Sequence, residues 1–121
     1  MFGFEKLDVW QKAIELTDYI YTITRSFPND ERFGLTSQMR RSSVSIASNI
    51  AEGSGRGSNP DFCRFIEIAY SSLMELITQL KIANRQDFLA QLAYSEAYEK
   101  SEQIARMLSG LRSSLSTQTS H

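Results

Sequence analysis

This chain of 121 residues has one cysteine, one histidine and two prolines, and its net charge at pH 7 is only −1. With Cys63 alone, neither an intrachain disulfide nor a cysteine-based metal cage can form. His121 is the last residue, which makes it a poor metal ligand or general base. Because the whole molecule carries no strong field, any site for an anion has to be local.

Long apolar runs are also missing, so we predict neither a membrane-spanning segment nor a signal peptide. We therefore expect a cytoplasmic protein without membrane contacts. No motif indicates a cofactor or a small-molecule substrate, and neither is expected. A chain of this length is most simply one domain, residues 1–121.

Apolar residues instead recur at alternating steps of three and four, which is the spacing of helices in an antiparallel bundle. The third segment shows this repeat most clearly: Phe62, Ile66, Ala69, Leu73, Leu76, Leu80 and Ala83. The pattern predicts helices at about residues 8–27, 36–53, 59–84 and 91–115, with a frayed tail at 116–121. No segment resembles a strand. The predicted fold class is all-α, an antiparallel up-down-up-down four-helix bundle.

Residues with helix-starting or helix-ending chemistry punctuate the repeat. The expected N-cap residues are Asp8, then Thr36 or Ser37, then Ser58 or Asn59. Pro28 is expected to end the first helix, since proline lacks an amide hydrogen and disfavours helix before itself. Residues 1–7 are expected to form an extended arm.

The segment from Gln38 to Arg64 carries the most unusual chemistry. Its arginines are Arg40, Arg41, Arg56 and Arg64, and with Glu52 and Asp61 they give residues 40–64 a local charge of +2. Arginine suits phosphate because its planar fork donates two hydrogen bonds at once. One hypothesis is a phosphate-contacting patch, and the other is solvated helix faces with ion pairs. Consecutive arginines point about 100° apart on a helix, so we expect at most one of Arg40 and Arg41 to face any given groove.

A glycine-rich turn, residues 53–57, lies in the middle of this segment. Amides at the following helix start could hold an anion, but a Walker loop would need a preceding strand and a Gly-Lys-Ser/Thr sequence, and both are missing. Asn49, Glu52 and Gly53 are interpreted as a structural polar corner. Glu52 could accept hydrogen bonds from the turn or pair with Arg56, and a lone Glu without a partner makes a poor catalyst.

Other candidates have a structural interpretation beside the functional one. Five tyrosines could stack on bases, although packing in the core or at an interface is the favoured interpretation. Cys63 is interpreted as a small buried hydrophobe. Trp10, Ile14, Tyr21 and Val44 lie outside the predicted core repeat, which suggests extra covered faces and hence an oligomer.

Three stretches carry a resemblance to a known family: LDVWQKAIEL, FPNDERFGLTSQMRRSSVSIASNIAEGSGR and FCRFIEIAYSSLMELITQL. The core pattern is SI-x-x-NIAEG-x-x-R at residues 45–56, preceded by GL-x-x-Q-x-RR at residues 34–41. These resemble the four-helix bundles encoded in intervening sequences of bacterial 23S ribosomal RNA genes, a family similar to the accessory protein of diversity-generating retroelements. Departures from the pattern are Ser42, Ser43, Ala47 and Ser71, and none of them affects the arginines.

The resemblance implies a homo-oligomer, a ring of five subunits, with a nucleic-acid-binding role for RNA or DNA. The first hypothesis is thus a non-enzymatic oligomeric bundle whose arginine face binds nucleic acid. The alternative is a structural or protein-interaction module in which the arginines form ion pairs between subunits. A catalytic role has no supporting constellation of residues.

Overall fold

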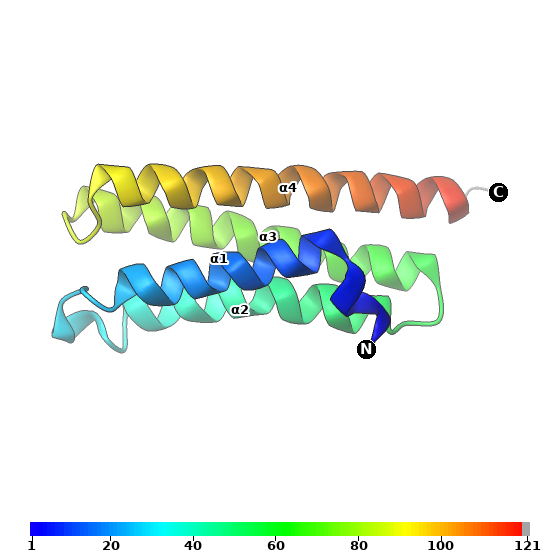
Figure 1. Cartoon of the computed structure of the whole chain (residues 1–121), viewed down its shortest axis with the longest axis horizontal. Helices are drawn as coiled ribbons and strands as arrows, with labels where there is room; N and C mark the ends of the chain where they lie inside the picture. The colour runs from blue at the N-terminus through cyan, green and yellow to red at the C-terminus, as the bar shows by residue number, and fades with distance from the viewer. Residues whose placement is uncertain (120–121) are drawn as a thin grey trace.

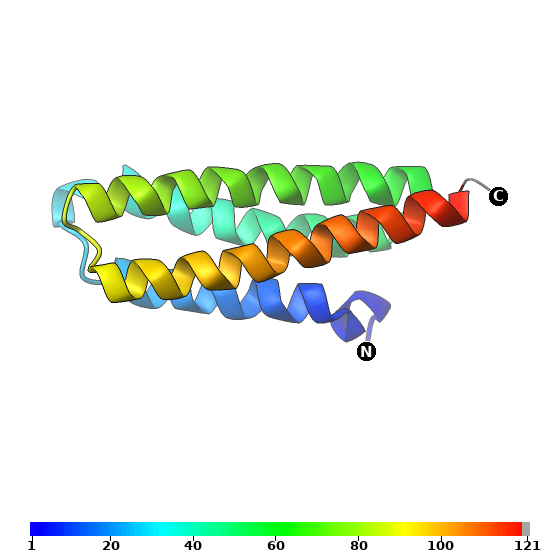
Figure 2. The same cartoon turned by 90° about the horizontal axis from the view of Figure 1, so that it is seen from above.

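The computed structural model describes residues 1–119, and no described residue lies in a strand. Its elements are a 3₁₀ turn η1 (Gly3–Lys6), α1 (Asp8–Thr24), a second 3₁₀ turn η2 (Asn29–Glu31), α2 (Leu35–Ser54), α3 (Asn59–Arg85) and α4 (Gln91–Thr119). Figures 1 and 2 show each long helix running opposite to the one before it. Helix α1 packs against α2 and α4, and α3 packs against the same two helices. The predicted all-α four-helix fold is confirmed.

The predicted apolar repeat faces one common core. In α2 every residue at this spacing is buried, including the polar Ser43: Leu35, Met39, Ser43, Ile46 and Ile50. In α3 all members from Ile66 onward are buried, and only Phe62 is half-buried. Burying one such Leu or Ile side chain contributes about 1.5–3 kcal/mol, so the repeat that predicts the helices also stabilises their packing.

Small residues let α2 and α3 approach closely. Ser42, Ala47 and Ser72 are buried, and the hydroxyls of Ser45 and Ser72 lie 2.9 Å apart across the two helices. At Gly53 a Cβ atom would lie 2.6 Å from the Cβ of Phe65. The glycine is therefore required by the close approach of α3.

The expected extended arm at residues 1–7 is wrong. Gly3–Lys6 form the 3₁₀ turn η1, and Glu5 Oε1 accepts a hydrogen bond from the amide of Phe2 at 2.8 Å. The ring of Phe4 packs edge-on against Trp10, with the two ring centroids 5.3 Å apart. This aromatic contact holds the arm against α1 and covers part of Trp10.

Two of the expected N-caps are also wrong. The N-cap of α1 is Leu7, and Asp8 is the first helical residue. At that position the helix dipole still stabilises its negative charge. Helix α2 starts at Leu35, before either expected cap, and the amide of Leu35 donates to Glu31 Oε1 at 3.2 Å. The cap at the third helix is confirmed, since Ser58 Oγ accepts from the amide of Asp61 at 3.3 Å.

All four helices end at other residues than expected, α2 and α3 by one residue and α1 and α4 by more. Helix α1 ends at Thr24 rather than at residue 27, because Pro28 restricts the preceding residue and the chain tightens into i−3 hydrogen bonds. Helix α4 continues to Thr119, so the tail expected to fray from residue 116 is helical up to that point. Residues 120 and 121, including His121, lie outside the described residues.

The described residues provide neither a membrane span nor a metal-binding cluster. None of the described helices is long and apolar enough to cross a membrane. Within residues 1–119, no group of three or more His, Cys, Asp or Glu side chains could hold a metal ion.

Candidate functional site

The four arginines singled out by the sequence do not form one patch within the chain. Arg40 and Arg41 lie in the second turn of α2, whereas Arg56 and Arg64 flank the α2–α3 corner. At about 1.5 Å per helical residue, α2 separates the two pairs by roughly 20 Å. Figure 1 places these two ends of α2 at opposite ends of the bundle. Each pair therefore has its own surroundings.

The pair at the α2–α3 corner is engaged with its own chain. Arg56 lies 4.0 Å from a carboxylate oxygen of Glu52, and Arg64 lies 3.3 Å from Asp61. Both guanidinium groups also lie near the ring of Phe65, with Cζ atoms 4.6 and 5.6 Å from its centroid. These arginines have carboxylate and aromatic partners, as the ion-pair interpretation of the sequence expects for them.

The side chain of Arg40 is held against α1. Its Nε donates to Thr24 Oγ1 at 2.9 Å, and its Cζ lies 4.6 Å from the centroid of the Tyr21 ring. Its Nη2 also points at the carbonyl oxygen of Tyr21, at 3.5 Å. None of these partners is charged, so Arg40 is fixed in position with its positive charge uncompensated.

Arg41 is exposed, and among the described residues its side chain makes no hydrogen bond or ion pair. Both Arg40 and Arg41 nevertheless border one open hollow of about 420 Å³. The expectation that at most one of them faces any given groove is therefore wrong. Their Cα–Cβ bonds diverge, but the long side chains converge on a hollow that is wide and lies between α1 and α2.

Two more arginines join this end of the bundle. Arg32 borders the same hollow, and with Arg25 and Arg40 it also lines a neighbouring one of about 230 Å³. The sequence interpretation missed both, because it counted charge only from residue 40 onward. Residues 25–41 contain four arginines against Asp30 and Glu31, which gives the same local excess of +2.

We call Arg25, Arg32, Arg40 and Arg41 the arginine cluster. Within residues 1–119, no carboxylate lies within ion-pair distance of any of them. Of the two acids nearby in sequence, Glu31 already has a hydrogen-bond partner, since its Oε1 accepts from the amide of Leu35. The larger hollow is bordered by Tyr21 from α1, by Arg32 and Phe33 from the connector, and by Arg40, Arg41 and Val44 from α2. Among residues 1–119, neither a carboxylate nor a thiol lines it.

The residues interpreted as a polar corner make contacts of different kinds. Asn49 Nδ2 donates to the carbonyl and hydroxyl oxygens of Ser45, at 2.8 and 3.0 Å, and so does not reach the glycine turn. Through the Ser45–Ser72 contact this network joins α2 to α3. Glu52 pairs with Arg56, and Gly53 gives Phe65 room. Asn49 and Gly53 thus lie where α2 packs on α3, whereas Glu52 joins the end of α2 to the turn.

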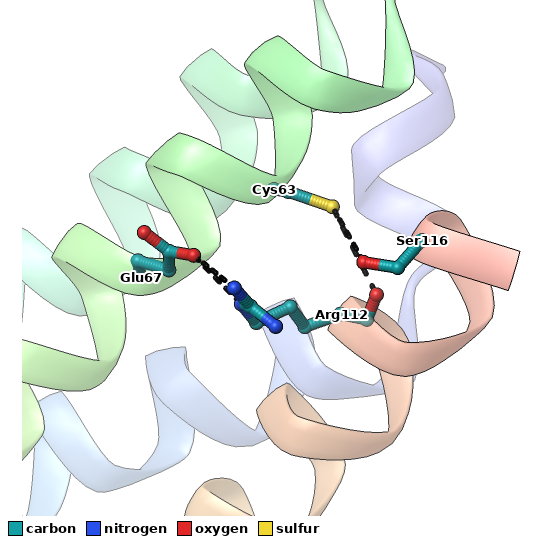
Figure 3. A network of polar contacts seen from close by, with 4 residues as sticks. All are labelled: Cys63, Glu67, Arg112 and Ser116. Carbon is teal, nitrogen blue, oxygen red and sulfur yellow. Dashed lines mark hydrogen bonds and ion pairs between the residues drawn. The ribbon is translucent and has the colours of Figure 1, made fainter. Parts of the chain in front are cut away.

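Helices α3 and α4 are joined by a polar network, shown in Figure 3. Arg112 Nε donates to Glu67 Oε1 at 2.8 Å, and Arg112 Nη2 contacts the same oxygen. The hydrogen bond and charge of Glu67 raise the pKa of Arg112. Cys63 Sγ lies 3.8 Å from both the carbonyl oxygen of Arg112 and the hydroxyl of Ser116. Cys63 is half-buried and packs against the core, so the expected buried hydrophobe is only partly buried, and its thiol has polar neighbours.

Helices α1 and α4 are joined by a second polar contact. The hydroxyl of Tyr19 donates to Glu96 Oε2 at 2.6 Å, and the ammonium of Lys100 lies 5.4 Å from the centroid of the Tyr19 ring. Burial of the phenol, and then the hydrogen bond and charge of Glu96, raise the pKa of Tyr19 to about 12. The phenol thus stays protonated and keeps donating across the usual pH range.

Comparisons with known proteins agree with this architecture. The model of the 23S rRNA-intervening sequence protein family matches residues 5–110. The fold is similar to the crystal structure of a protein of unknown function from the S23 ribosomal protein family of Bacteroides thetaiotaomicron. That likeness has a TM-score of 0.80 and 24% identity, and covers 87% of this chain and 95% of the other. No curated protein matches the sequence significantly. Since the family match spans most of the chain and includes the whole arginine cluster, the protein belongs to the 23S rRNA-intervening sequence protein family.

Proposed function

We propose that this protein is a non-enzymatic helical bundle that binds the nucleic-acid backbone through the arginine cluster. The observation that carries the proposal is that four arginines share one end of the bundle without a carboxylate partner among the described residues. Leaving four like charges together costs free energy unless an anion neutralises them. Phosphate is the anion that a guanidinium fork matches best.

Arg56 and Arg64 are less suited to this contact than the arginine cluster. A phosphate would have to displace Glu52 and Asp61 from these side chains. Arg40, in contrast, is oriented by Thr24 and Tyr21 with its charge free, and within residues 1–119 the side chain of Arg41 has no ion-pair partner to give up. Pre-oriented, unpaired arginines lose less on binding than paired ones do.

Self-association is the second part of the proposal. Apolar side chains that lie outside the core and do not border the hollow are partly exposed: Ile14 of α1 by 38%, and Ile68 and Ile82 of α3 by 43% and 45%. A second copy that covered them would leave the hollow open and bring two arginine clusters into one assembly. Each added cluster would strengthen binding through effective concentration, which offsets the overall charge of −1.

The test is fluorescence anisotropy with labelled RNA and DNA across a range of salt concentrations. We expect binding by the wild type that weakens steeply with salt, and a loss of at least tenfold in the Arg40→Ala/Arg41→Ala variant. The matched control is Arg56→Ala/Arg64→Ala, which removes the same charge at the other end of α2. An absence of wild-type binding, or an equal loss in both double variants, contradicts a site at the arginine cluster.

The exposed apolar side chains also favour the second candidate, a structural or protein-interaction module. In that case Arg40→Ala/Arg41→Ala would lower the oligomer mass rather than nucleic-acid affinity. Size-exclusion chromatography with light scattering on the same variants separates the two functions.

A further inference from the structure

Phe33 is the most exposed aromatic side chain among the described residues. Its surface is 89% exposed, whereas Phe27, the other phenylalanine of the α1–α2 connection, is 6% exposed and packs against Phe88 with ring centroids 5.8 Å apart. One aromatic residue of this connection thus completes the core, and the other stands outside it. Single exposed apolar residues are common, and Phe33 differs from them in its surroundings.

The surroundings of Phe33 are cationic and aromatic. Its ring borders the 420 Å³ hollow together with Arg32, Arg40 and Arg41, and Tyr21 lines the same hollow from α1. The Cζ of Arg32 lies 5.3 Å from the centroid of the Phe33 ring, which still leaves most of that ring open.

The backbone at Phe33 is fixed on both sides. The amide of Arg32 donates to the carbonyl of Asn29 at 3.2 Å, and the amide of Gly34 donates to the carbonyl of Glu31 at 3.0 Å. Glu31 also caps α2 through the amide of Leu35. The exposed ring is therefore carried by a hydrogen-bonded turn, which limits the entropy lost when a ligand stacks on it.

From this arrangement we infer that Phe33 is a stacking platform for a base of single-stranded nucleic acid, whose adjacent phosphates lie on Arg40 and Arg41. The inference rests on the proposed function and names its substrate class. Open aromatic rings beside backbone-binding cations are the combination by which proteins hold single strands. In a duplex the bases are already stacked and paired, so a duplex offers the cluster its phosphates but no base for Phe33.

The experiment uses the full chain and two labelled probes of equal length, a single-stranded oligouridine and a duplex RNA, at low salt. We expect Phe33→Ala and Phe33→Leu to weaken oligouridine binding about tenfold while leaving duplex binding unchanged. Phe33→Tyr and Phe33→Trp keep a ring and retain the affinity. Phe2→Ala, which removes another exposed ring at the opposite end of α1, is the matched control.

A stacking readout accompanies the affinities. A single strand carrying 2-aminopurine has its fluorescence quenched by the wild type and by Phe33→Trp, but not by Phe33→Leu. Unchanged oligouridine affinity in Phe33→Ala and Phe33→Leu overturns the inference, and so does a change confined to the oligomer mass, which would make Phe33 a contact between copies. If Arg40→Ala/Arg41→Ala loses binding and the Phe33 variants do not, only the inference fails. If Arg40→Ala/Arg41→Ala binds as the wild type does, the proposed function itself fails.

Discussion

The guanidinium of Arg40 stacks on the ring of Tyr21, with 4.6 Å between Cζ and the ring centroid. This contact, and the hydrogen bond to Thr24, give Arg40 a structural role that its neighbour Arg41 lacks. The two consecutive arginines therefore differ in what they do for the fold, although both border the same hollow.

We predict that Arg40→Ala lowers the free energy of unfolding by about 1–2 kcal/mol, since it removes a cation–π contact and leaves the buried Thr24 hydroxyl without one partner. Arg41→Ala changes it by less than about 0.5 kcal/mol. Urea unfolding monitored by circular dichroism measures both. Equal stability losses in the two variants would show that Tyr21 and Thr24 do not anchor Arg40.

A second prediction concerns the glycine at the α2–α3 corner. In Gly53→Ala the new Cβ would lie 2.6 Å from Phe65 Cβ and 3.0 Å from Phe62 Cδ1. We expect a loss of about 1–3 kcal/mol from this overlap, despite the helix preference of alanine. Gly57→Ala is the control, because nothing lies within 4 Å of its new methyl group. Thermal unfolding measures the stability of the two variants. A Gly53→Ala protein as stable as the wild type would contradict the packing argument.

The fold could be predicted from the sequence because the buried residues of a helix recur at a fixed spacing along a short stretch of chain. Every third or fourth residue of α3 is apolar, and that spacing alone indicates which face is buried. Helix ends were less predictable, since Glu31 caps α2 from across a turn, four residues before Leu35. That contact depends on how the connection folds and follows no simple capping pattern.

The site was predictable only in part for the same reason. Arg40 and Arg41 stand out as a pair, but their grouping with Arg25 and Arg32 depends on how the connection between α1 and α2 turns. Likewise, the sequence alone does not distinguish the burial of Phe27 from that of Phe33. Only the position of Pro28 and the turn after it sends one ring to the core and the other to solvent.

The third prediction concerns pH. The pKa of Tyr19 is raised from 10.0 to about 12, first by burial and then by Glu96. Since the folded state favours the protonated phenol, the stabilisation is complete below pH 10 and is lost as the pH rises toward 12. Ultraviolet titration of the wild type minus Tyr19→Phe isolates this phenol. In Glu96→Gln its pKa should fall only part of the way, because burial remains, and a difference curve centred near 10 would contradict the contact.

The fourth prediction concerns Gln79, which lies on α3 and is 5% exposed. Its Oε1 is buried without a hydrogen-bond partner among the described residues. An unsatisfied buried amide costs about 1–3 kcal/mol, so Gln79→Leu should be neutral or stabilising by about 1 kcal/mol. Gln38→Leu, at an exposed position of α2, should change stability by less than about 0.5 kcal/mol. A marked loss of stability in Gln79→Leu by urea unfolding would show that this amide has a partner in solution.

The last prediction uses Cys63 as a natural probe of the α3–α4 network. Its thiol lies against the α4 backbone at Arg112 and the hydroxyl of Ser116, and the Arg112–Glu67 ion pair holds that part of α4 in place. Glu67→Gln and Arg112→Gln remove the charge pair, so the end of α4 should separate from α3 more often. We expect the labelling rate of Cys63 by a thiol reagent to rise several-fold under native conditions in both variants.

Glu75→Gln neutralises another exposed acid of α3 that makes no ion pair among the described residues, and should leave the rate unchanged. Since Cys63 is the only cysteine, the signal has a single source. Equal labelling rates in all four proteins would mean that the helix packing protects the thiol without help from the ion pair.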